Sequence, residues 1–252
     1  MPSRKEFINL GFDPLSRPAI VEAILGACTH PRFRYVVTPN VDHMIRIDSD
    51  PEVAALYRNA WLCLNDSRIL SALARLARID LPATPGADLV VDLLNDPRLA
   101  RDTPILVVGG DPGLPRQMRM LLGLTAVDQY RPPMNLLRDA EAMRATVEAV
   151  EASGASLVFL AVGSPQQEHV AARLAARGKT GGVGLCIGAG LEFLVGARQR
   201  APRWMQRAGL EWAFRLATEP RRLGRRYLVA GPRIFAIFLS YLAARRADPQ
   251  RG

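Results

Sequence analysis

The segment SLVFLAVG, residues 156–163, is a run of apolar residues that ends in a glycine. Four further runs resemble it: RYVVTPN at 34–40, WLCLND at 61–66, PILVVGG at 104–110 and GVGLCIG at 182–188. Each run is continuously apolar instead of alternating with polar residues, which is typical of parallel strands that are buried on both faces. The five runs therefore predict the strands of a parallel sheet.

Helical patterns separate these runs. We expect one helix to begin at Pro51 with Asp50 as its N-cap, and others over residues 17–28, 67–79, 86–96, 113–124, 139–152 and 166–177. Strands that alternate with helices indicate an α/β fold, here a Rossmann-like and mostly parallel sheet with helices on both faces.

Positive charge is concentrated at the C-terminal end of the chain. The protein has 252 residues and a net charge of +9. Residues 198–252 hold thirteen arginines and three acidic residues, a net charge of +10, so the other 197 residues carry a net charge of −1. We expect an α/β catalytic domain over residues 1–197 and a basic helical appendage over residues 198–252, with an anionic partner for the appendage.

Aromatic residues lie between the arginines of the appendage, in APRWMQRAGLEWAFRLATEPRRLGRRY at 201–227. A nucleic acid, a membrane surface or a phosphate-rich substrate would each suit this pattern. The longest apolar run, residues 234–244, has 11 residues and is shorter than the ~20 residues that span a bilayer. This length favours a helix that lies in the membrane interface or packs on the body.

Polar residues and glycines follow the predicted strands. In open α/β sheets, ligands bind beyond the carboxyl ends of the strands, where glycines admit a ligand and helix N-termini favour anions. The residues at these ends are Thr38, Asn40, Asp66, Gly109, Gly110, Gly163, Pro165, Gln167, Glu168, Gly188 and Glu192. Purely structural roles stay open at this point: Asp66 could cap the following helix, and Thr38 and Asn40 could be turn residues.

Several sequence signatures are missing or weak. A nicotinamide-dependent oxidoreductase is one function class that this fold allows. No GxGxxG motif is present, which argues against this class. A nucleic-acid-binding protein is another function class, and it would need a recognised motif and a more basic body. Asp48 and Asp50 match the DxD metal motif, but Asp50 is better explained as an N-cap. The three histidines and three cysteines lack metal-ligand spacing.

A set of short motifs together resembles the WecG/TagA/CpsF family of bacterial glycosyltransferases, over residues 33–235. The motifs are TPN followed by an acid and His43, the Asp that ends the second strand, PGADL, GGDPG, GSPQQE, GAGLEFLVG and RAPRWMQRAGLEWAFRLATEPRRLGRRYL. The last of these is long and specific.

The resemblance implies an inverting transfer of a hexose or N-acetylhexosamine-type sugar from a UDP-sugar to a polyprenyl-diphosphate-linked glycan. It implies no metal and no other cofactor. The products would belong to cell-surface polysaccharides such as exopolysaccharide, capsule, teichoic acid or common antigen. The enzyme would be cytoplasmic and peripheral on the inner face of the cell membrane, with its C-terminal region on the anionic lipid surface. No nucleic acid is implied, and a homo-oligomer stays open.

The resemblance also implies roles for individual residues. Asp66 would be the general base that an inverting displacement requires, and Thr38 would lie near the donor sugar and phosphate. Asn40, Gly163, Pro165, Gln167, Glu168 and Gly188 would bind the donor, Gly109 and Gly110 would lie against the nucleotide, and Glu192, where the family usually has Asp, would bind the ribose. Arg215, Arg222 and Arg225 would close over the leaving diphosphate.

Two segments depart from the family pattern. Ala83-Thr84 stands where the family often has an arginine before PGADL, and Ser67-Arg68 stands where it often has Gly-x-Gly. Both changes lie near the expected donor pocket, so the identity of the donor sugar stays open.

Overall fold

The structure, a computed structural model, describes residues 3–188, 190–194, 196, 201–202, 204–205 and 209–247, with the side chains of Arg222 and Arg226 left out. Its strands are β1 (Lys5–Phe7), β2 (Leu10–Phe12), β3 (Arg34–Val37), β4 (Leu62–Cys63), β5 (Ile105–Gly109), β6 (Val127–Tyr130), β7 (Leu157–Ala161) and β8 (Val183–Cys186). Its helices in the first 188 residues are α1 (Arg17–Ala27), α2 (Val41–Ser49), α3 (Pro51–Arg58), α4 (Arg68–Leu76), α5 (Gly86–Asn95), α6 (Leu114–Leu122), η1 (Leu136–Arg138), α7 (Ala140–Ser153) and α8 (Gln166–Arg177). Beyond these lie α9 (Gly190–Leu194), α11 (Glu211–Thr218), α12 (Pro220–Gly224), the π-helix η2 (Arg225–Ala230) and α13 (Arg233–Ala247).

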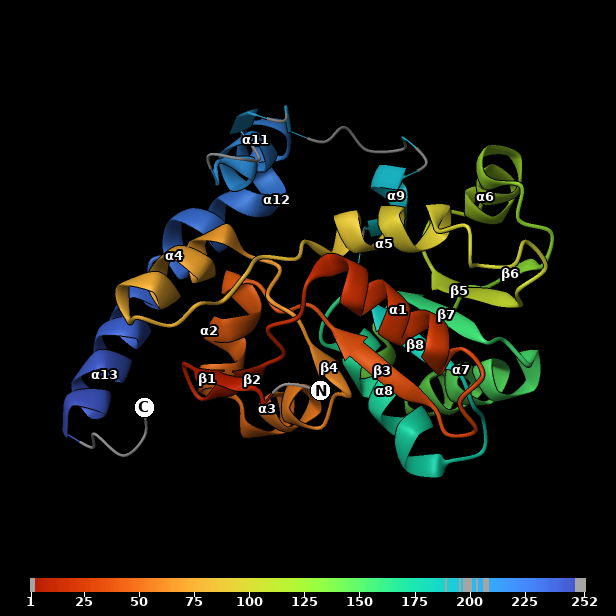
Figure 1. Cartoon of the computed structure of the whole chain (residues 1–252), viewed down its shortest axis with the longest axis horizontal. Coiled ribbons are helices and arrows are strands. Elements are labelled where there is room, and N and C mark those ends of the chain that lie inside the picture. The colour runs from red at the N-terminus through yellow and green to blue at the C-terminus, as the bar shows by residue number, and fades with distance from the viewer. Residues whose placement is uncertain are drawn as a thin grey trace.

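The central sheet has six strands in the order β4-β3-β8-β7-β5-β6, and every pairing in it is parallel (Figure 1). The prediction of a parallel α/β sheet is confirmed. Successive side chains of each strand enter different cores: in β3, Tyr35 and Val37 face one side of the sheet and Val36 the other. Both faces are therefore covered, which explains why the strands are continuously apolar.

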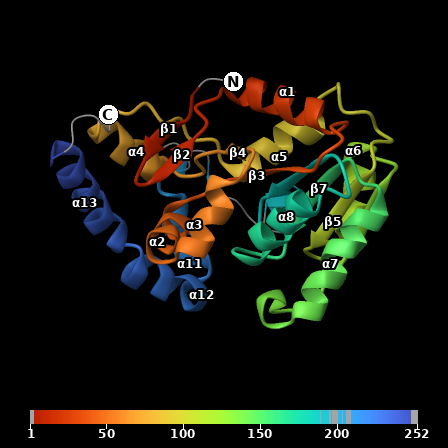
Figure 2. The same ribbon diagram turned by 90° about the horizontal axis from the view of Figure 1, so that it is seen from below.

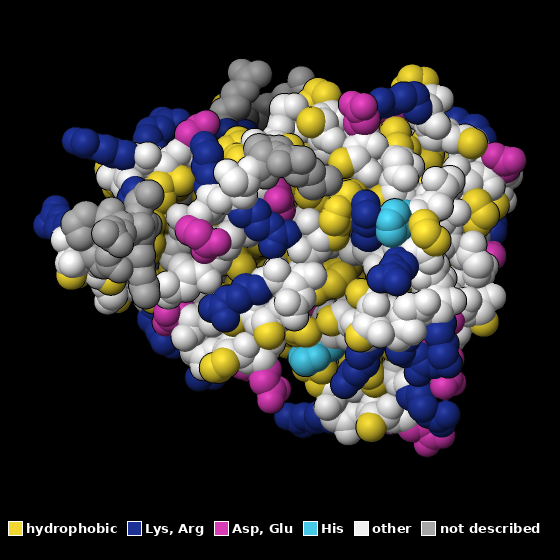
Figure 3. Space-filling model, turned by 60° about the horizontal axis from the view of Figure 1, so that its bottom comes forward, with side chains coloured by type: hydrophobic (Ala, Val, Ile, Leu, Met, Phe, Trp, Pro, Cys, Tyr) yellow, Lys and Arg dark blue, Asp and Glu magenta, His cyan; other side chains and the backbone are white. Residues whose placement is uncertain are grey.

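Two sets of helices cover the two faces. The side chains of α2, α3, α4, α7, α8 and α13 form one core with the sheet, and those of α1, α5, α6 and α9 form the other. Figure 2 shows α1 and α5 on the side of the sheet opposite α2 and α3. On the face drawn in Figure 3, basic side chains are spread widely, with hydrophobic and acidic ones between them.

The neighbouring strands β3 and β8 form one switch point of the sheet. The chain leaves β3 toward α2, on one face, and leaves β8 toward α9, on the other. Because the two connections part, a crevice is expected beyond the carboxyl ends of these strands, where ligands bind in folds of this kind.

The C-terminal helix packs against the body on the side opposite β6 and α6 (Figure 1). Ile234 and Phe238 of α13 are buried, and the ring of Phe238 lies 6.2 Å from that of Phe7 in the small antiparallel hairpin β1–β2. Arg245 donates a hydrogen bond of 2.7 Å to the carbonyl of Ala77, just beyond the end of α4. The start and the end of the chain are thereby packed together.

One helical run in the described part of the chain, Tyr227–Ala247, is long and apolar enough by length and composition to cross a membrane. It has 21 residues, because the helical run continues beyond the apolar run at 234–244 at both ends. The prediction that this segment is too short to span a bilayer was therefore wrong about its length.

Most predicted elements are present, with ends that differ by a few residues. The N-cap role of Asp50 is confirmed, since its carboxylate accepts hydrogen bonds from the backbone N–H groups of Glu52 and Val53. The sequence did not predict α2, the hairpin β1–β2 or the edge strand β6. The predicted strand at 61–66 is shorter than expected and is reduced to Leu62–Cys63.

Candidate active site

Asp66 follows β4, at the carboxyl edge of the sheet. Its carboxylate accepts a hydrogen bond of 2.7 Å from the backbone N–H of Gly86, the first residue of α5. The following helix, α4, is instead capped by Ser67, whose hydroxyl accepts a hydrogen bond from the N–H of Leu70. Asp66 is thus held on α5, and the idea that it only caps the next helix is wrong.

Burial raises the pKa of Asp66 to about 6, while the hydrogen bond from Gly86, the charge of Arg215 and the side chain of Asn40 oppose this rise. A carboxyl group with this pKa is ionised at neutral pH and is still basic enough to take a proton. These are the properties that a general base needs near pH 7.

Asn40 connects Asp66 with the end of β3. Its side-chain oxygen accepts hydrogen bonds from the backbone N–H groups of Asp42 and His43, and so caps α2. Its side chain is also close enough to Asp66 to lower the pKa of that carboxyl group.

Thr38 lies beside the same glycine. Its hydroxyl donates a hydrogen bond of 3.4 Å to the carbonyl of Cys186 in β8, and the Thr38 side chain is buried. A methyl group placed on Gly86 would lie 3.1 Å from the Thr38 oxygen, so a side chain at this position would crowd the Thr38 hydroxyl. Thr38, Asn40 and Asp66 therefore come together around the start of α5, as predicted from their places at strand ends.

The C-terminal appendage reaches this edge through Arg215 of α11. Its guanidinium lies 4.9 Å from the centre of the Phe193 ring in α9 and pairs with Glu211 at 3.4 Å. Its positive charge lowers the pKa of Asp66, whereas the negative charge of Glu211 raises it. A cation from the end of the chain is thus brought near a carboxylate from the first third of it.

The structure says less about Arg222 and Arg225, the other two arginines that were predicted to close over the leaving diphosphate. Arg225 is exposed at the start of η2, next to the end of α12. Arg222 belongs to α12, and its side chain lies outside the described residues. Their joint role with Arg215 stays a prediction.

Gly163 and Gly188, after β7 and β8, expose their backbone to open space. Both have positive φ values, 80° and 52°, and a methyl group on either would meet no atom within 4 Å. Space beside a glycine backbone is what a bound nucleotide would need. Glu192 lies one turn further on, in α9, and is partly buried.

Gly109 and Gly110 are required by packing. A methyl group on Gly109 would lie 2.7 Å from Val162, and one on Gly110 would lie 2.6 Å from Leu114. Both residues have positive φ values, so the turn between β5 and α6 needs glycine at both positions. Their contact with a nucleotide stays a prediction.

Gln167 and Glu168, on the first turn of α8 after Pro165, point into the protein instead of outward. Their exposed fractions are 3% and 1%. The Gln167 amide donates to Glu168 and accepts from the backbone N–H of Gly188 at 3.1 Å. Burial raises the pKa of Glu168, and hydrogen bonds from Gln167 and Tyr57 oppose this. Glu168 also accepts a hydrogen bond of 3.0 Å from the Tyr57 hydroxyl, a partner that sequence reasoning missed.

Comparison with protein families matches residues 5–248 to the glycosyl transferase WecG/TagA/CpsF family. The match includes the sheet, the edge that carries Asp66 and the appendage that carries Arg215. Of the three function classes considered from the sequence (glycosyltransferase, oxidoreductase and nucleic-acid-binding protein), the match supports the glycosyltransferase. The chain therefore belongs to the WecG/TagA/CpsF family of glycosyltransferases, and it is an enzyme that transfers a sugar from a donor to an acceptor.

Proposed function

We propose that the protein is an inverting, metal-independent glycosyltransferase that moves a sugar from a UDP-sugar to a polyprenyl-diphosphate-linked glycan in the synthesis of a cell-surface polysaccharide. The observation that supports this most is the placement of Asp66, with its pKa of about 6, near the charge of Arg215 at the carboxyl edge of the sheet. The pair supplies a base for the acceptor and a cation for the departing diphosphate.

The reaction forms one bond and breaks another at the anomeric carbon of the donor sugar. The acceptor hydroxyl attacks this carbon and passes its proton to the Asp66 carboxylate. The bond from the carbon to the diphosphate oxygen breaks, and UDP leaves with the bonding electrons. Arg215 offsets the negative charge that grows on the diphosphate, which is where a preorganised cation has its largest effect.

The donor would lie over the switch point between β3 and β8. Thr38 and Asn40 stand at the end of β3, and the open backbone of Gly163 and Gly188 follows β7 and β8. Glu192 in α9 is the acidic side chain on the β8 side that would accept hydrogen bonds from the ribose. Arg222 and Arg225 would add to Arg215 when the appendage closes.

The reaction class is tested by measuring UDP release by the purified protein in the presence of EDTA. The donors are UDP-glucose, UDP-N-acetylmannosamine, its uronic acid and UDP-N-acetylglucosamine, each with a polyprenyl-diphosphate-linked sugar in detergent. We expect release with one donor, and only when the acceptor is present. Activity that EDTA abolishes and Mg²⁺ or Mn²⁺ restores would contradict metal independence, and hydrolysis that needs no acceptor would contradict transfer to a lipid-linked glycan.

The pH dependence of the reaction follows from the raised pKa of Asp66. The base must be ionised to take a proton, so kcat/KM should be constant above the pKa and should fall about tenfold per pH unit below it. We expect this fall to begin near pH 6, where a carboxyl group with an ordinary pKa would place it near pH 4. A profile that stays flat from pH 7 down to pH 5 would show that Asp66 does not titrate in the rate-determining step.

The localisation that we propose is peripheral attachment to the cytoplasmic face of the membrane through the appendage. Hydrophobic side chains there are exposed: Trp204 (64%), Leu228 (62%), Val229 (69%), Phe235 (54%) and Leu239 (64%). The other side of α13 is buried against the body through Ile234 and Phe238. A helix that keeps one face in the protein core suits lying on a bilayer better than crossing one, and nearby arginines would attract anionic lipids.

Attachment to lipid is tested with the double variant Phe235→Ser/Leu239→Ser. It removes two exposed side chains of α13 and leaves the buried face intact, so partition into anionic vesicles should fall by at least ~10-fold in a flotation assay. The control is Met120→Ser/Leu121→Ser, which changes two equally exposed side chains of α6 at the far side of the molecule (72% and 62%). Equal flotation of both double variants would contradict the proposal.

A further inference from the structure

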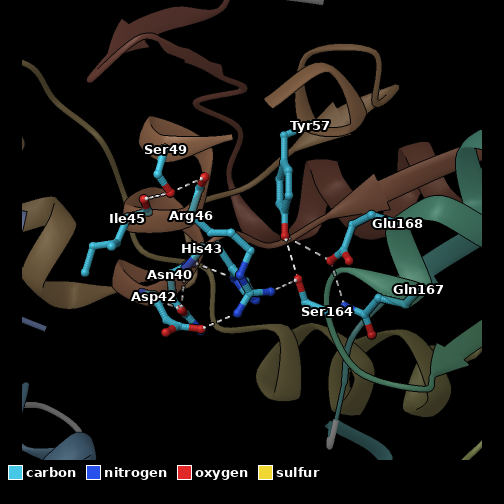
Figure 4. Close-up of polar contacts among 10 residues, drawn as sticks. All are labelled: Asn40, Asp42, His43, Ile45, Arg46, Ser49, Tyr57, Ser164, Gln167 and Glu168. Carbon is cyan, nitrogen blue, oxygen red and sulfur yellow. Dashed lines mark hydrogen bonds and ion pairs between the residues drawn. The ribbon is translucent and has the colours of Figure 1, made fainter. Parts of the chain in front are cut away.

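A buried polar cluster lies behind the edge of the sheet, and the reaction described above does not use it directly. Its members are Tyr57, Ser164, Gln167 and Glu168, and we refer to it as the Glu168 cluster (Figure 4). The Glu168 oxygen Oε1 accepts hydrogen bonds from the Tyr57 hydroxyl at 3.0 Å and from the Gln167 amide at 2.9 Å. The Tyr57 hydroxyl is also 3.2 Å from the Ser164 hydroxyl. The cluster thus joins α3, α8 and the loop after β7.

Each branch of the cluster ends at a loop that carries residues of the proposed donor site. Gln167 accepts the backbone N–H of Gly188, at the end of β8. Ser164 stands between Gly163 and Pro165, at the end of β7. The Ser164 hydroxyl also accepts a hydrogen bond of 3.1 Å from Arg46 of α2, the helix that Asn40 caps at the end of β3. The loops after β7 and β8 are therefore connected through Tyr57 and Glu168, and Arg46 of α2 joins this path at Ser164.

Tyr57 and Glu168 are too deeply buried to touch a substrate. Each has an exposed fraction of 1%. Any effect they have on the reaction must pass through Ser164, Gln167 and Arg46. Figure 4 shows the Tyr57 ring coming from α3 with its hydroxyl pointing toward Ser164 and Glu168.

We propose that Tyr57 is a positioning residue of this glycosyltransferase: held on Glu168, its hydroxyl fixes the loops at Gly163–Pro165 and Gly188 in the arrangement that receives the nucleotide of the donor. The inference rests on the proposed donor site. Gly163 and Gly188 have open space beside them and no side chain to restrain them, so their backbone must be ordered from behind. Loops that are ordered before binding lose less conformational entropy when the ligand arrives.

The test compares Tyr57→Phe with Tyr35→Phe. Tyr35 is a similarly buried tyrosine in β3, and its hydroxyl donates a hydrogen bond of 2.6 Å to the backbone carbonyl of Leu56 instead of to a side chain of the Glu168 cluster. Both variants lose one buried hydroxyl and should lose similar thermal stability. Tyr57→Phe should weaken UDP binding about 10-fold by calorimetry, and Tyr35→Phe should stay within about twofold of the wild type.

Steady-state kinetics separate positioning from chemistry. For Tyr57→Phe we expect KM for the donor to rise about 10-fold, with kcat and the fall in rate near pH 6 unchanged, because Asp66 is not touched. Ser164→Ala breaks the same path at its next member and serves if Tyr57→Phe folds poorly. The double variant Tyr57→Phe/Ser164→Ala should bind UDP at least as tightly as the weaker-binding of the two single variants, because both changes interrupt the same path.

Hydrogen exchange gives a readout that needs no ligand. Peptides that cover 160–168 and 183–190 should exchange faster in Tyr57→Phe than in Tyr35→Phe. If the wild type binds no UDP, the proposed donor is wrong, and the exchange result alone decides whether the cluster orders the loops. Equal exchange in the two variants would overturn the inference, as would equal UDP affinity when the wild type binds UDP.

Discussion

Asp66→Asn is expected to lower sugar transfer by ~10²–10⁴-fold and to leave UDP affinity within about twofold, because the amide cannot take the proton of the acceptor hydroxyl. The amide oxygen can still accept the hydrogen bond from Gly86, which the carboxylate accepts at 2.7 Å. The start of α5 should therefore keep its place. The measurement is acceptor-dependent UDP release together with calorimetric UDP binding, with the donor that the wild type uses.

The matched control is Asp13→Asn. Asp13 is a buried aspartate that likewise accepts a backbone N–H, that of Cys63 at 2.8 Å, and it also pairs with Arg4. This change should cost stability through the weakened ion pair, yet transfer per folded molecule should stay unchanged. Full turnover by Asp66→Asn would remove Asp66 from the mechanism, and an equal loss in Asp13→Asn would point to general destabilisation.

The place of Asp66 could be predicted because strand ends are visible in the sequence. Five apolar runs predicted five of the six strands of the sheet, and parallel strands bring their carboxyl ends to one edge. Thr38, Asn40 and Asp66 accordingly surround the start of α5. The missed strand, β6, lies at the edge of the sheet and has exposed polar residues, so it lacks the continuous apolar pattern.

Helix α2 was missed for a related reason. Asn40 was considered as a turn residue or as a donor-binding residue, and neither interpretation predicted that it caps a helix whose capping box His43 completes. The usual signature of such a box has Glu or Gln in the position of His43, so the pattern did not predict a helix start.

The buried partners of the site could not be predicted from single residues. Tyr57 follows Val53 at helical spacing on an apolar face, and that pattern predicts only a core residue. Its hydroxyl function depends on Ser164 and Glu168, which are more than a hundred residues away in the chain. The approach of Arg215 to Asp66 likewise depends on how α11 packs on α9. The sequence predicted a role for Arg215 only through the resemblance to a family.

Arg215→Ala is expected to lower transfer by ~10²–10³-fold, the usual effect of removing one preorganised group that stabilises charge in a transition state. The variant should also shift the pH profile. The positive charge of Arg215 lowers the pKa of Asp66, so its removal raises that pKa and moves the fall in kcat/KM from near pH 6 to a higher pH. Arg215→Lys keeps the charge and loses the planar guanidinium, so it should retain the pH profile better than the rate.

The control for Arg215→Ala is Arg144→Ala, since Arg144 in α7 also pairs with a glutamate one helical turn away, Glu148 at 3.6 Å, on a helix outside the candidate site. Its loss should leave both the rate and the pH profile unchanged. If Arg215 acts near Asp66, Arg215→Ala must change both the transfer rate and the pH profile. A lower rate with an unchanged pH profile would mean that Arg215 stabilises the appendage from a distance, and a shifted profile with an unchanged rate would mean that the leaving diphosphate is neutralised by another group.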